Sequence, residues 1–422
     1  MVVVSRVFVL VSTLLCSGVS TEPLHEVVVS TAQERSNRNA GLHVYMESIP
    51  KVDVRSDLHK IDRMTPDFIH EVTFVIRQRN MLELTTILND VSDPASVNYG
   101  RHMTKEQVAY LTSNPEARDA VVSHLSASGA TIVAETLHGE YITANASISV
   151  WESMFNTQFF MYHQSEDSIR IRKMVRAESY SIPVGLQLYV DGVFNTIQMP
   201  SQSFGNSGTL VREKEDAEGI NLAATSYMMP STLRKFYSVG DTQGSISSTQ
   251  AIFATIDQHF SPSDLSTFQT AFSLRPQAVA NVIGGHSSDY ICYFYPESCV
   301  EGNLDVQYIM AASPVSPTTF WYTDDSWSGW LTSVANTPNP PLVFSISYGQ
   351  EEYYVTQVEK DAFNTEAIKL GAMGVTIVAA SGDDGAVSRY ARSAGSFGCY
   401  YAALFPASNP YVTAVGATSV SQ

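Results

Sequence analysis

Two acidic side chains, Glu301 and Asp305, stand four residues apart in the stretch Glu-Gly-Asn-Leu-Asp-Val-Gln-Tyr-Ile-Met at residues 301–310. The apolar residues around them recur with helical spacing and predict the opening turns of a helix whose apolar face is Leu304, Tyr308, Ala311 and Ala312. On that helix the two carboxyls would project from one side, with Cβ atoms roughly 6 Å apart. Where such a side is buried, one ionised carboxylate raises the pKa of its neighbour. By spacing alone, two solvated acids at a helix start would be the simpler interpretation, so the assignment depends on the rest of the chain.

A second stretch of interest spans residues 375–385, Val-Thr-Ile-Val-Ala-Ala-Ser-Gly-Asp-Asp-Gly. Its β-branched run ends abruptly in a turn of small and acidic residues, which is typical of a buried parallel strand that reaches a site. Asp383 follows this strand, and Ser347 ends another predicted strand at residues 342–347. Because sites in parallel sheets lie at the carboxyl ends of the strands, we expect both residues at the same edge. A turn-capping aspartate would instead give Asp383 a structural role.

Four blocks of sequence together resemble the sedolisins, the serine-carboxyl peptidases, and within them the tripeptidyl-peptidase I type. The blocks are Glu-Gly-Asn-Leu-Asp-Val-Gln-Tyr at 301–308, Ser-Ile-Ser-Tyr-Gly at 345–349, Ser-Gly-Asp-Asp-Gly at 381–385 and Phe-Pro-Ala-Ser-Asn-Pro-Tyr-Val-Thr-Ala-Val-Gly at 405–416. Each block alone is a weak signal, whereas their order and spacing together are specific. The resemblance covers nearly the whole chain, because residues 93–104 are similar to the activation domain of sedolisin zymogens.

The resemblance implies a catalytic role for each of the three acids. Glu301 would be the general base toward a nucleophilic serine, Asp305 would orient Glu301, and Asp383 would donate a hydrogen bond to the oxyanion. A carboxylate can still accept a proton near pH 4, where a histidine base would be protonated. A carboxylic acid donates only while it is protonated, so this arrangement suits an acidic medium.

The segment Ser347, Tyr348 and Gly349 would bind substrate in the same scheme. Its backbone would pair with an extended peptide, as a strand added to a sheet edge does. The structural alternative for these three residues is the end of a core strand. The partners implied are peptide or protein substrates, together with the chain's own prodomain as an intramolecular inhibitor.

The chain departs from the family pattern at the nucleophile. In the family the serine lies in a Gly-Thr-Ser-x-x-x-Pro motif, followed by a calcium site near the C-terminus. The segment Gly-Ala-Thr-Ser at residues 416–419 imitates this motif but has no proline after it, and we interpret it as a strand end. The sequence is therefore expected to be a truncated precursor that lacks the serine, with calcium ligands beyond residue 422.

Two functions from different classes remain open at this point. The first is the zymogen of an acid-active endopeptidase or tripeptidyl-peptidase. The second is a non-catalytic secreted protein that binds or inhibits peptides on the same scaffold. The three acids Glu301, Asp305 and Asp383 favour the first, because an inactive site need not keep them.

Composition excludes several partner classes. The chain has 422 residues, 44% hydrophobic and 16% charged, which is typical of a compact globular protein with more than one domain. Its formal charge of −17 argues against nucleic acid and anionic membranes as partners, since both require basic surface. Residues 1–20 have the pattern of a secretory signal, with Arg6, an apolar run and small residues. The apolar run is too short for a membrane span, so we expect a secreted protein or one in a lysosome-like or vacuole-like acidic compartment.

The cysteines fit an oxidising compartment. Removal of the signal would remove Cys16 and leave Cys292, Cys299 and Cys399. The two cysteines that are close in sequence, Cys292 and Cys299, are predicted to form a local bridge. Cys399 then has no partner within the chain.

The chain divides into segments of different character. Alternating short strands and helices predict an α+β activation prodomain, ferredoxin-like by resemblance, at residues 21–200. Within it, Thr-Lys-Glu-Gln at residues 104–107 is a capping-box pattern. Residues 201–223 are flexible or charged without apolar periodicity, and we predict that they form a cleavable linker.

Residues 224–422 are predicted to form the peptidase domain, incomplete at its C-terminus. Apolar runs predict strands that alternate with helices, and this alternation indicates an α/β parallel sheet with covering helices, similar to subtilisin. The strands are expected at residues 251–257, 278–283, 342–347, 375–380 and 411–415, and the helices at residues 263–272, 301–312 and 356–370.

Overall fold

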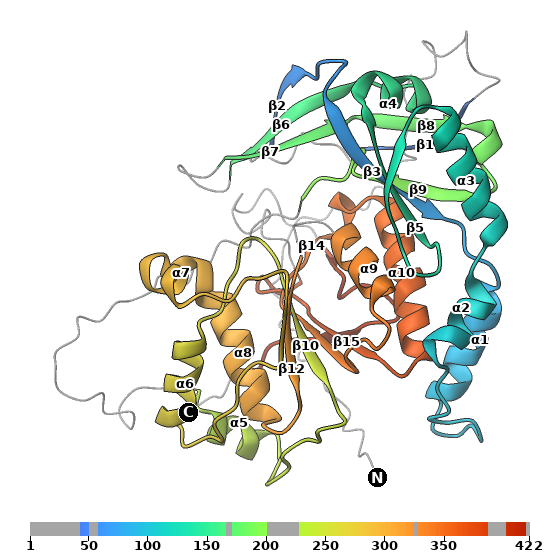
Figure 1. The fold of residues 1–422 in the computed structure, drawn as a ribbon. Coiled ribbons are helices and arrows are strands. Elements are labelled where there is room, and N and C mark those ends of the chain that lie inside the picture. Colours follow the sequence, from blue (N-terminus) through green and yellow to red (C-terminus); the bar gives the residue numbers. More distant parts are fainter. Residues whose placement is uncertain are drawn as a thin grey trace, which may run out of the picture.

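The computed structural model describes residues 43–49, 58–165, 171–200, 228–323, 327–386 and 402–418. It contains two units, for which we keep the names expected from the sequence, the prodomain (residues 43–200) and the peptidase domain (residues 228–418) (Figure 1). The predicted signal at residues 1–20, the predicted linker at residues 201–223, Cys399 and Ser419 lie outside the described residues.

A six-stranded parallel sheet forms the middle of the peptidase domain. Every residue of its two neighbouring strands β10 and β12 is buried, as expected for strands that are covered on both faces. In order across the sheet the strands are β11 (Asn281–Ile283), β12 (Thr318–Tyr322), β10 (Gln250–Ala254), β13 (Val343–Ile346), β15 (Thr376–Ala380) and β17 (Thr413–Val415).

Helices cover both faces of this sheet (Figure 1). Successive side chains of a strand point to opposite faces, so Ile252 packs with Val306 and Met310 on one side, while Phe253 packs with Trp330 on the other. The first face is covered by α6 (Pro262–Ala271) and α8 (Val300–Ala312), and the second by α9 (Trp327–Asn336) and α10 (Gln357–Ala372). The smaller elements are α5 (Pro230–Phe236), α7 (Asp289–Phe294), the 3-10 turns Pro296–Cys299 and Glu352–Tyr354, and the antiparallel pair β14 (Gln350–Glu351) and β16 (Leu404–Phe405).

The prodomain is built around a four-stranded antiparallel sheet with the strand order β4-β5-β3-β9. Helices α1, α2 and α3 connect β3 to β4, and α4 follows β5, which is the ferredoxin-like split βαβ arrangement. These elements are β3 (Ile69–Ile76), α1 (Met81–Ser92), α2 (Lys105–Thr112), α3 (Pro115–Ala127), β4 (Thr131–Glu135), β5 (Tyr141–Ser147), α4 (Ile148–Phe155) and β9 (Val190–Phe194). Two further sheets complete the prodomain: β2 (Leu58–Arg63) with β6 (Phe159–Ser165) and β7 (Ile171–Ala177), and β1 (His43–Ser48) with β8 (Ser179–Pro183), which is followed by the 3-10 turn Val184–Leu186.

The predicted α/β class, with an α+β prodomain before a parallel sheet, is confirmed. The capping box is also present, because the Thr104 hydroxyl accepts from the Gln107 backbone N–H while the Gln107 side chain accepts from that of Thr104. Some boundaries were predicted wrongly. The strand expected at residues 251–257 ends at Ala254, since Ile256 and Asp257 both have a φ of 53°, outside the range of strands. β12 and α9 were not predicted.

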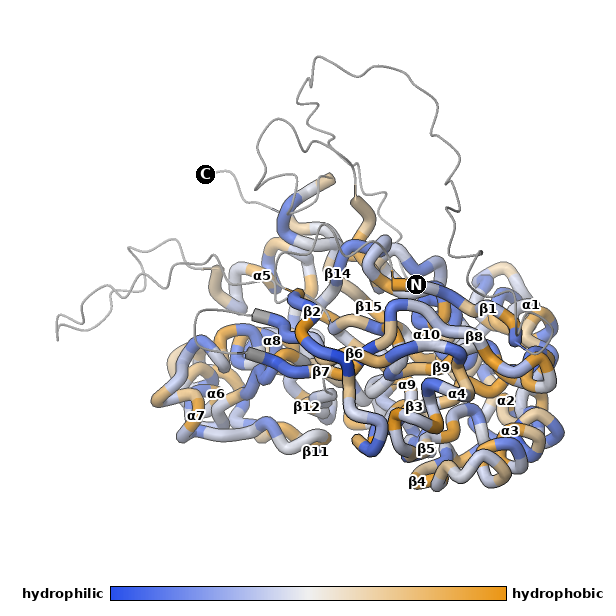
Figure 2. Tube along the Cα trace, turned by 90° about the horizontal axis from the view of Figure 1, so that it is seen from above, coloured by the Kyte–Doolittle hydropathy of each residue, from blue (hydrophilic) through white to orange (hydrophobic). Residues whose placement is uncertain are grey.

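The prodomain packs directly on α10. Seen from above, α9 and α10 lie between the peptidase helices α6 and α8 on one side and the prodomain helices α1 to α3 on the other (Figure 2). Val75, Tyr141 and Phe194 of the prodomain belong to the same apolar cluster as Phe363 of α10. Gly192 of β9 allows this close contact, because a Cβ there would lie 2.2 Å from a methyl carbon of Val358.

Charged groups are buried in the same interface. Lys369 of α10 donates to Glu140 of the prodomain and to Glu366 of its own helix, each at 3.0 Å. A second lysine, Lys105 of α2, donates to the carbonyls of Ala335 at 2.6 Å and Thr337 at 2.5 Å. These carbonyls lie at the C-terminal end of α9, where a cation is stabilised by the helix dipole. The prodomain thus supplies a cap to a peptidase helix.

Among three glutamates in this interface, two have a raised pKa and the third has a lowered one. Burial raises the pKa of both Glu47 and Glu359 from 4.5 to about 7. Burial acts in the same direction on Glu140, but the positive charge of Lys369 and several hydrogen bonds outweigh it and lower the pKa of Glu140 to about 2. Below about pH 7, Glu47 and Glu359 therefore favour the protonated state in this structure, whereas Glu140 favours the ionised state above about pH 2.

These shifts predict how precursor stability depends on pH. The contribution of Glu47 and Glu359 is complete below their ordinary value of 4.5 and is lost as the pH rises through about 7. The contribution of Glu140 is complete above 4.5 and is lost as the pH falls toward about 2. We therefore expect the melting temperature to be highest between about pH 4 and 6. Scanning calorimetry from pH 2 to 8 measures the melting temperature. Glu359→Gln should reduce the fall in melting temperature toward neutral pH and leave the fall toward pH 2 unchanged. An unchanged fall toward neutral pH would contradict the role given to Glu359.

The buried lysine gives a second stability prediction. Lys369→Met leaves two buried carboxylates without their cation and should lower the free energy of unfolding of the precursor by about 3–5 kcal/mol. Arg77→Met is the matched control, because Arg77 forms a half-exposed pair with Asp191 at 2.6 Å, and it should cost at most about 1 kcal/mol. Urea denaturation of both variants checks the difference, and equal losses would show that the Lys369 cluster adds nothing beyond a surface pair.

Candidate active site

The carboxyl ends of the parallel strands meet the first turns of α8 at one edge of the sheet. Ser347 directly follows β13, and its Oγ donates a hydrogen bond to Oδ1 of Asp305 at 2.8 Å. Gln258 lies in the loop after β10, and its Oε1 accepts from the backbone N–H of Glu301 at 3.2 Å. The fold therefore brings both acids of α8 to the strand edge.

The buried face of α8 differs from the predicted one. Gly302, Val306 and Met310 are buried at i, i+4 and i+8, whereas Leu304 is 48% exposed and Tyr308 is half-buried. The predicted face was therefore wrong at Leu304, Tyr308 and the exposed Ala312, and right at Ala311, which is buried. The apolar pattern misled because the two acids also point toward the protein.

Glu301 and Asp305 are neighbouring, partly buried carboxyls, which we call the carboxyl pair. Burial raises the pKa of Asp305 well above 3.8, the negative charge of Glu301 raises it further, and the hydrogen bond from Ser347 opposes both. Burial likewise raises the pKa of Glu301 above 4.5. Among the described residues, Oδ2 of Asp305 is buried with no hydrogen-bond partner. Two adjacent buried carboxyls share protons, so the pair can hold one proton and accept another in mildly acidic medium.

Asp383 lies in the exposed turn after β15. Its negative charge contributes to the raised pKa of Glu301, after the larger effect of burial. The structure thus places Asp383 near enough to Glu301 for their charges to interact, although the two come from different elements.

Tyr348 and Gly349 sit deeper than Ser347. Tyr348 is buried, with its ring edge-on to Phe253, and its pKa is raised well above 10 by burial and by the charges of Asp305 and Glu301. A Cβ at Gly349 would lie 2.8 Å from the carbonyl oxygen of Phe405. The sequence assigned only a backbone role to Ser347; the contact of its hydroxyl with Asp305 was missed, and no motif indicated it.

A loop after β10 supports the first turn of α8. The backbone N–H of His259 donates to the carbonyl of Ser298 at 2.8 Å. Glycine is required at position 302, where the loop passes close to α8, since a Cβ there would lie 2.2 Å from the carbonyl oxygen of His259. Just before α8, Cys292 and Cys299 form a disulfide, which confirms the predicted bridge.

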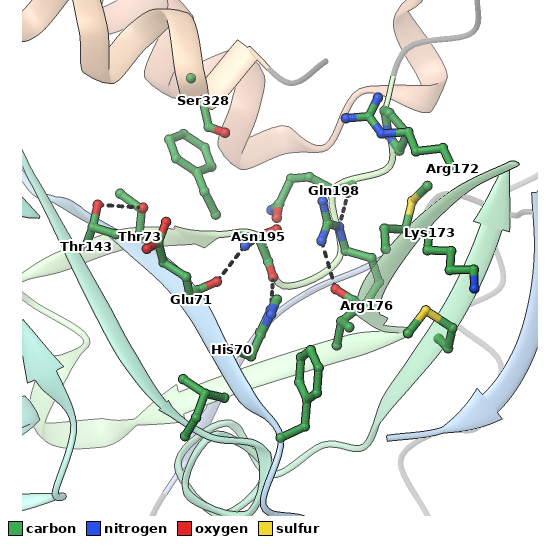
Figure 3. Close-up of a pocket in the computed structure, with 18 of the residues that line it drawn as sticks. His70, Glu71, Thr73, Thr143, Arg172, Lys173, Arg176, Asn195, Gln198 and Ser328 are labelled. Carbon is green, nitrogen blue, oxygen red and sulfur yellow. Dashed lines mark hydrogen bonds between the residues drawn. The ribbon is translucent and has the colours of Figure 1, made fainter. Parts of the chain in front are cut away.

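A cavity of about 660 Å³ lies elsewhere, between the prodomain and α9 (Figure 3). The side chains of His70, Arg172 and Arg176 line it together with Ser328 of α9, and none of the predicted site residues does. Burial lowers the pKa of His70 to about 4, and its Nε2 donates to the carbonyl of Asn195 at 2.8 Å. The cavity therefore belongs to the interface between the two units and not to the carboxyl pair.

The described part of the chain shows no cluster of acidic side chains of the kind that calcium prefers. Calcium takes six to eight oxygen ligands. The single group of three or more metal-ligating side chains among the described residues contains two histidines and one aspartate, so it does not fit that ion. Within the same residues, every helix is too short or too polar to cross a membrane.

Comparisons with known proteins found a matching family model and several similar proteins. Residues 56–199 match the family "Pro-kumamolisin, activation domain". Tripeptidyl-peptidase 1 of Dictyostelium discoideum is 31% identical over 82% of this chain and 61% of its own length. Tripeptidyl-peptidase 1 of Homo sapiens is 28% identical over 86% and 64%, and physarolisin of Physarum polycephalum is 30% identical over 87% and 63%.

The chain thus spans slightly less than two thirds of the length of these curated relatives. A solved structure of Pseudomonas sedolisin, a serine-carboxyl proteinase complexed with two molecules of pseudo-iodotyrostatin, is 23% identical and covers 44% of this chain and 52% of its own, with a TM-score of 0.35. The chain is therefore similar to the tripeptidyl-peptidase 1 proteins over more than four fifths of its own length, and its residues 56–199 match a pro-kumamolisin activation domain.

Proposed function

We propose that this chain is the precursor of an acid-active peptidase that hydrolyses peptide bonds, as an endopeptidase or a tripeptidyl-peptidase, in a secreted or lysosome-like compartment. The observation that carries the proposal is the partly buried pair of Glu301 and Asp305, which meets the Ser347 hydroxyl at the strand edge. A structural pair of acids gains nothing from such burial, because each raises the cost of ionising the other.

The pair supplies a general base. Glu301 accepts the proton of the attacking alcohol when it is ionised, and its raised pKa keeps it basic enough to do so in mildly acidic medium. Asp305, which is harder to ionise, holds the neighbouring proton and keeps Glu301 in place. Asp383 donates to the oxyanion in its protonated form. Ser347, Tyr348 and Gly349 pair their backbone with the substrate.

The nucleophilic serine is not assigned to any described residue. Ser347 is the serine that contacts the pair, but its hydroxyl donates to Asp305, and we give it a positioning role. Calcium, which the resemblance implies, is likewise assigned to no residue of this chain. The prodomain would keep the precursor inactive until it is removed.

The carboxyl pair is tested in the full-length precursor after activation in acid. Glu301→Gln and Asp305→Asn should each lower kcat for a peptide substrate by at least about 100-fold, because each removes part of one proton-transfer unit. The double variant should be little worse than either single one, since residues that act as a unit are not additive. Unchanged melting temperatures would show that folding is retained.

Glu297→Gln is the matched control, because Glu297 is exposed on the same segment, four residues before Glu301. It should leave kcat unchanged. Ser347→Ala should lower kcat less than Glu301→Gln. A wild-type rate in Glu301→Gln would remove Glu301 from the mechanism, and complete loss in Ser347→Ala would make Ser347 the nucleophile.

Maturation gives a separate prediction. The precursor should be cleaved within residues 201–223, because this charged stretch has no apolar periodicity with which to bury itself. N-terminal sequencing of the acid-treated protein locates the cut. A mature N-terminus inside α1 (Met81–Ser92) would be incompatible with the proposed prodomain boundary.

A further inference from the structure

Three metal-ligating side chains converge beside the candidate active site. Asp257 and His259 lie in the loop after β10, and His286 lies in the loop after β11. One ligand atom of each residue lies within 4.8 Å of the other two. Nε2 of His286 is 3.4 Å from Oδ1 of Asp257, and the two imidazole rings are 4.3 Å apart.

The backbone fixes both histidines in one tautomer. Nδ1 of His259 is 3.0 Å from the carbonyl oxygen of Asp257, and Nδ1 of His286 is 2.7 Å from that of Gly284. A carbonyl oxygen only accepts, so each Nδ1 must carry a proton and donate. In a neutral ring Nε2 then bears the lone pair. A metal-bound histidine is oriented in the same way, by donating its other ring N–H to a carbonyl or carboxylate.

The cluster is also held in place by packing. The ring of His286 stacks on that of Tyr322, with centroids 3.3 Å apart and planes inclined by 14°. The hydroxyl of Tyr322 accepts from the backbone N–H of Asp257 at 3.2 Å. Ile256 and Asp257 both adopt a positive φ of 53°, which is uncommon for residues other than glycine and for a β-branched residue is a true outlier. The loop is therefore bent into a conformation that turns Asp257 toward the two rings.

We propose that Asp257, His259 and His286 bind a divalent transition metal of the zinc class, independently of the peptidase chemistry. Zinc lies about 2.0–2.1 Å from histidine nitrogen and about 2.0–2.2 Å from carboxylate oxygen, so two ligands at a tetrahedral angle are about 3.3–3.5 Å apart. The separation of His286 and Asp257 falls in this range. Two imidazoles and one carboxylate suit zinc and its neighbours and do not suit calcium or magnesium. The fourth position is left for water.

A bound ion would act on the first turn of α8. The carbonyl of His259 abuts Gly302, and Gln258 accepts from the N–H of Glu301. Because these contacts join the loop to the helix, an ion that clamps Asp257 and His259 to His286 would fix the loop against the start of α8. The expected readout is a higher melting temperature in the presence of the metal.

The test is direct binding by the untagged full-length precursor at pH 7.5, where metal binding does not compete with protonated imidazole. Titration with ZnCl₂ should show one site per chain, and CoCl₂ should give the visible absorption of tetrahedral cobalt with nitrogen and oxygen ligands. His259→Ala, His286→Ala and Asp257→Asn should each weaken binding by roughly tenfold or more. Asp257 is 62% exposed, so Asp257→Asn leaves folding intact.

His163→Ala is the matched control, because His163 stands opposite His59 in the β2–β6 pair and could itself hold an ion. It should leave the zinc titration unchanged. Binding that disappears in His163→Ala and survives in Asp257→Asn and His286→Ala would place the ion on the prodomain and overturn the proposal. An absence of zinc and cobalt binding in the wild-type protein would overturn it as well.

Discussion

The structure depends on the burial of one helix, α10, on both sides. One side packs on the parallel sheet through Phe363 and Leu370, and the other receives the prodomain through Val358 and Ile368. Only a narrow strip of this helix, at Gln357 and Asp361, stays exposed to water, and Glu359, Glu366 and Lys369 are buried. Such groups are tolerated only with partners. Thr356 is the partner of Glu359, and Glu140 of the prodomain is a partner of Lys369. The contact between Glu140 and Lys369 joins the two units by charge as well as by apolar contact.

The chain treats its buried acids in two ways. At the interface, Glu140 has a buried cation and a hydroxyl as neighbours, and its ionised form is favoured. At the strand edge, Glu301 and Asp305 have one serine hydroxyl and each other, and ionisation of both is disfavoured. The first arrangement stabilises a fold, whereas the second keeps a proton mobile. This contrast is the physical reason for which we propose a structural role for Glu140 and a catalytic role for Glu301 and Asp305.

Sequence patterns predicted the parts of the structure that are local or fully buried. The strand at Thr376–Ala380, the helix at Gln357–Ala372 and the capping box at Thr104 all follow from short-range rules. β1 and β2 were not predicted, because they are polar and pair with β8 and β6, more than 90 residues away in the chain. His259 and His286 follow different strands and meet only through the sheet order. The hydroxyl contact of Ser347 with Asp305 has no sequence signal, since it depends on the position of α8 against β13.

The cap that Lys105 places on α9 has a consequence for the peptidase domain once it stands alone. Without the prodomain, the carbonyls of Ala335 and Thr337 would face water, and the apolar residues Ile368 and Ala372 of α10 would be uncovered. Lys369 then becomes an ordinary solvated side chain, and its pairing with Glu366 becomes a surface contact of little weight. The uncovered face would be an interaction surface, because an exposed apolar patch binds either the prodomain again or another apolar surface. A peptidase domain without the prodomain would therefore expose an apolar face that favours association between copies of the domain.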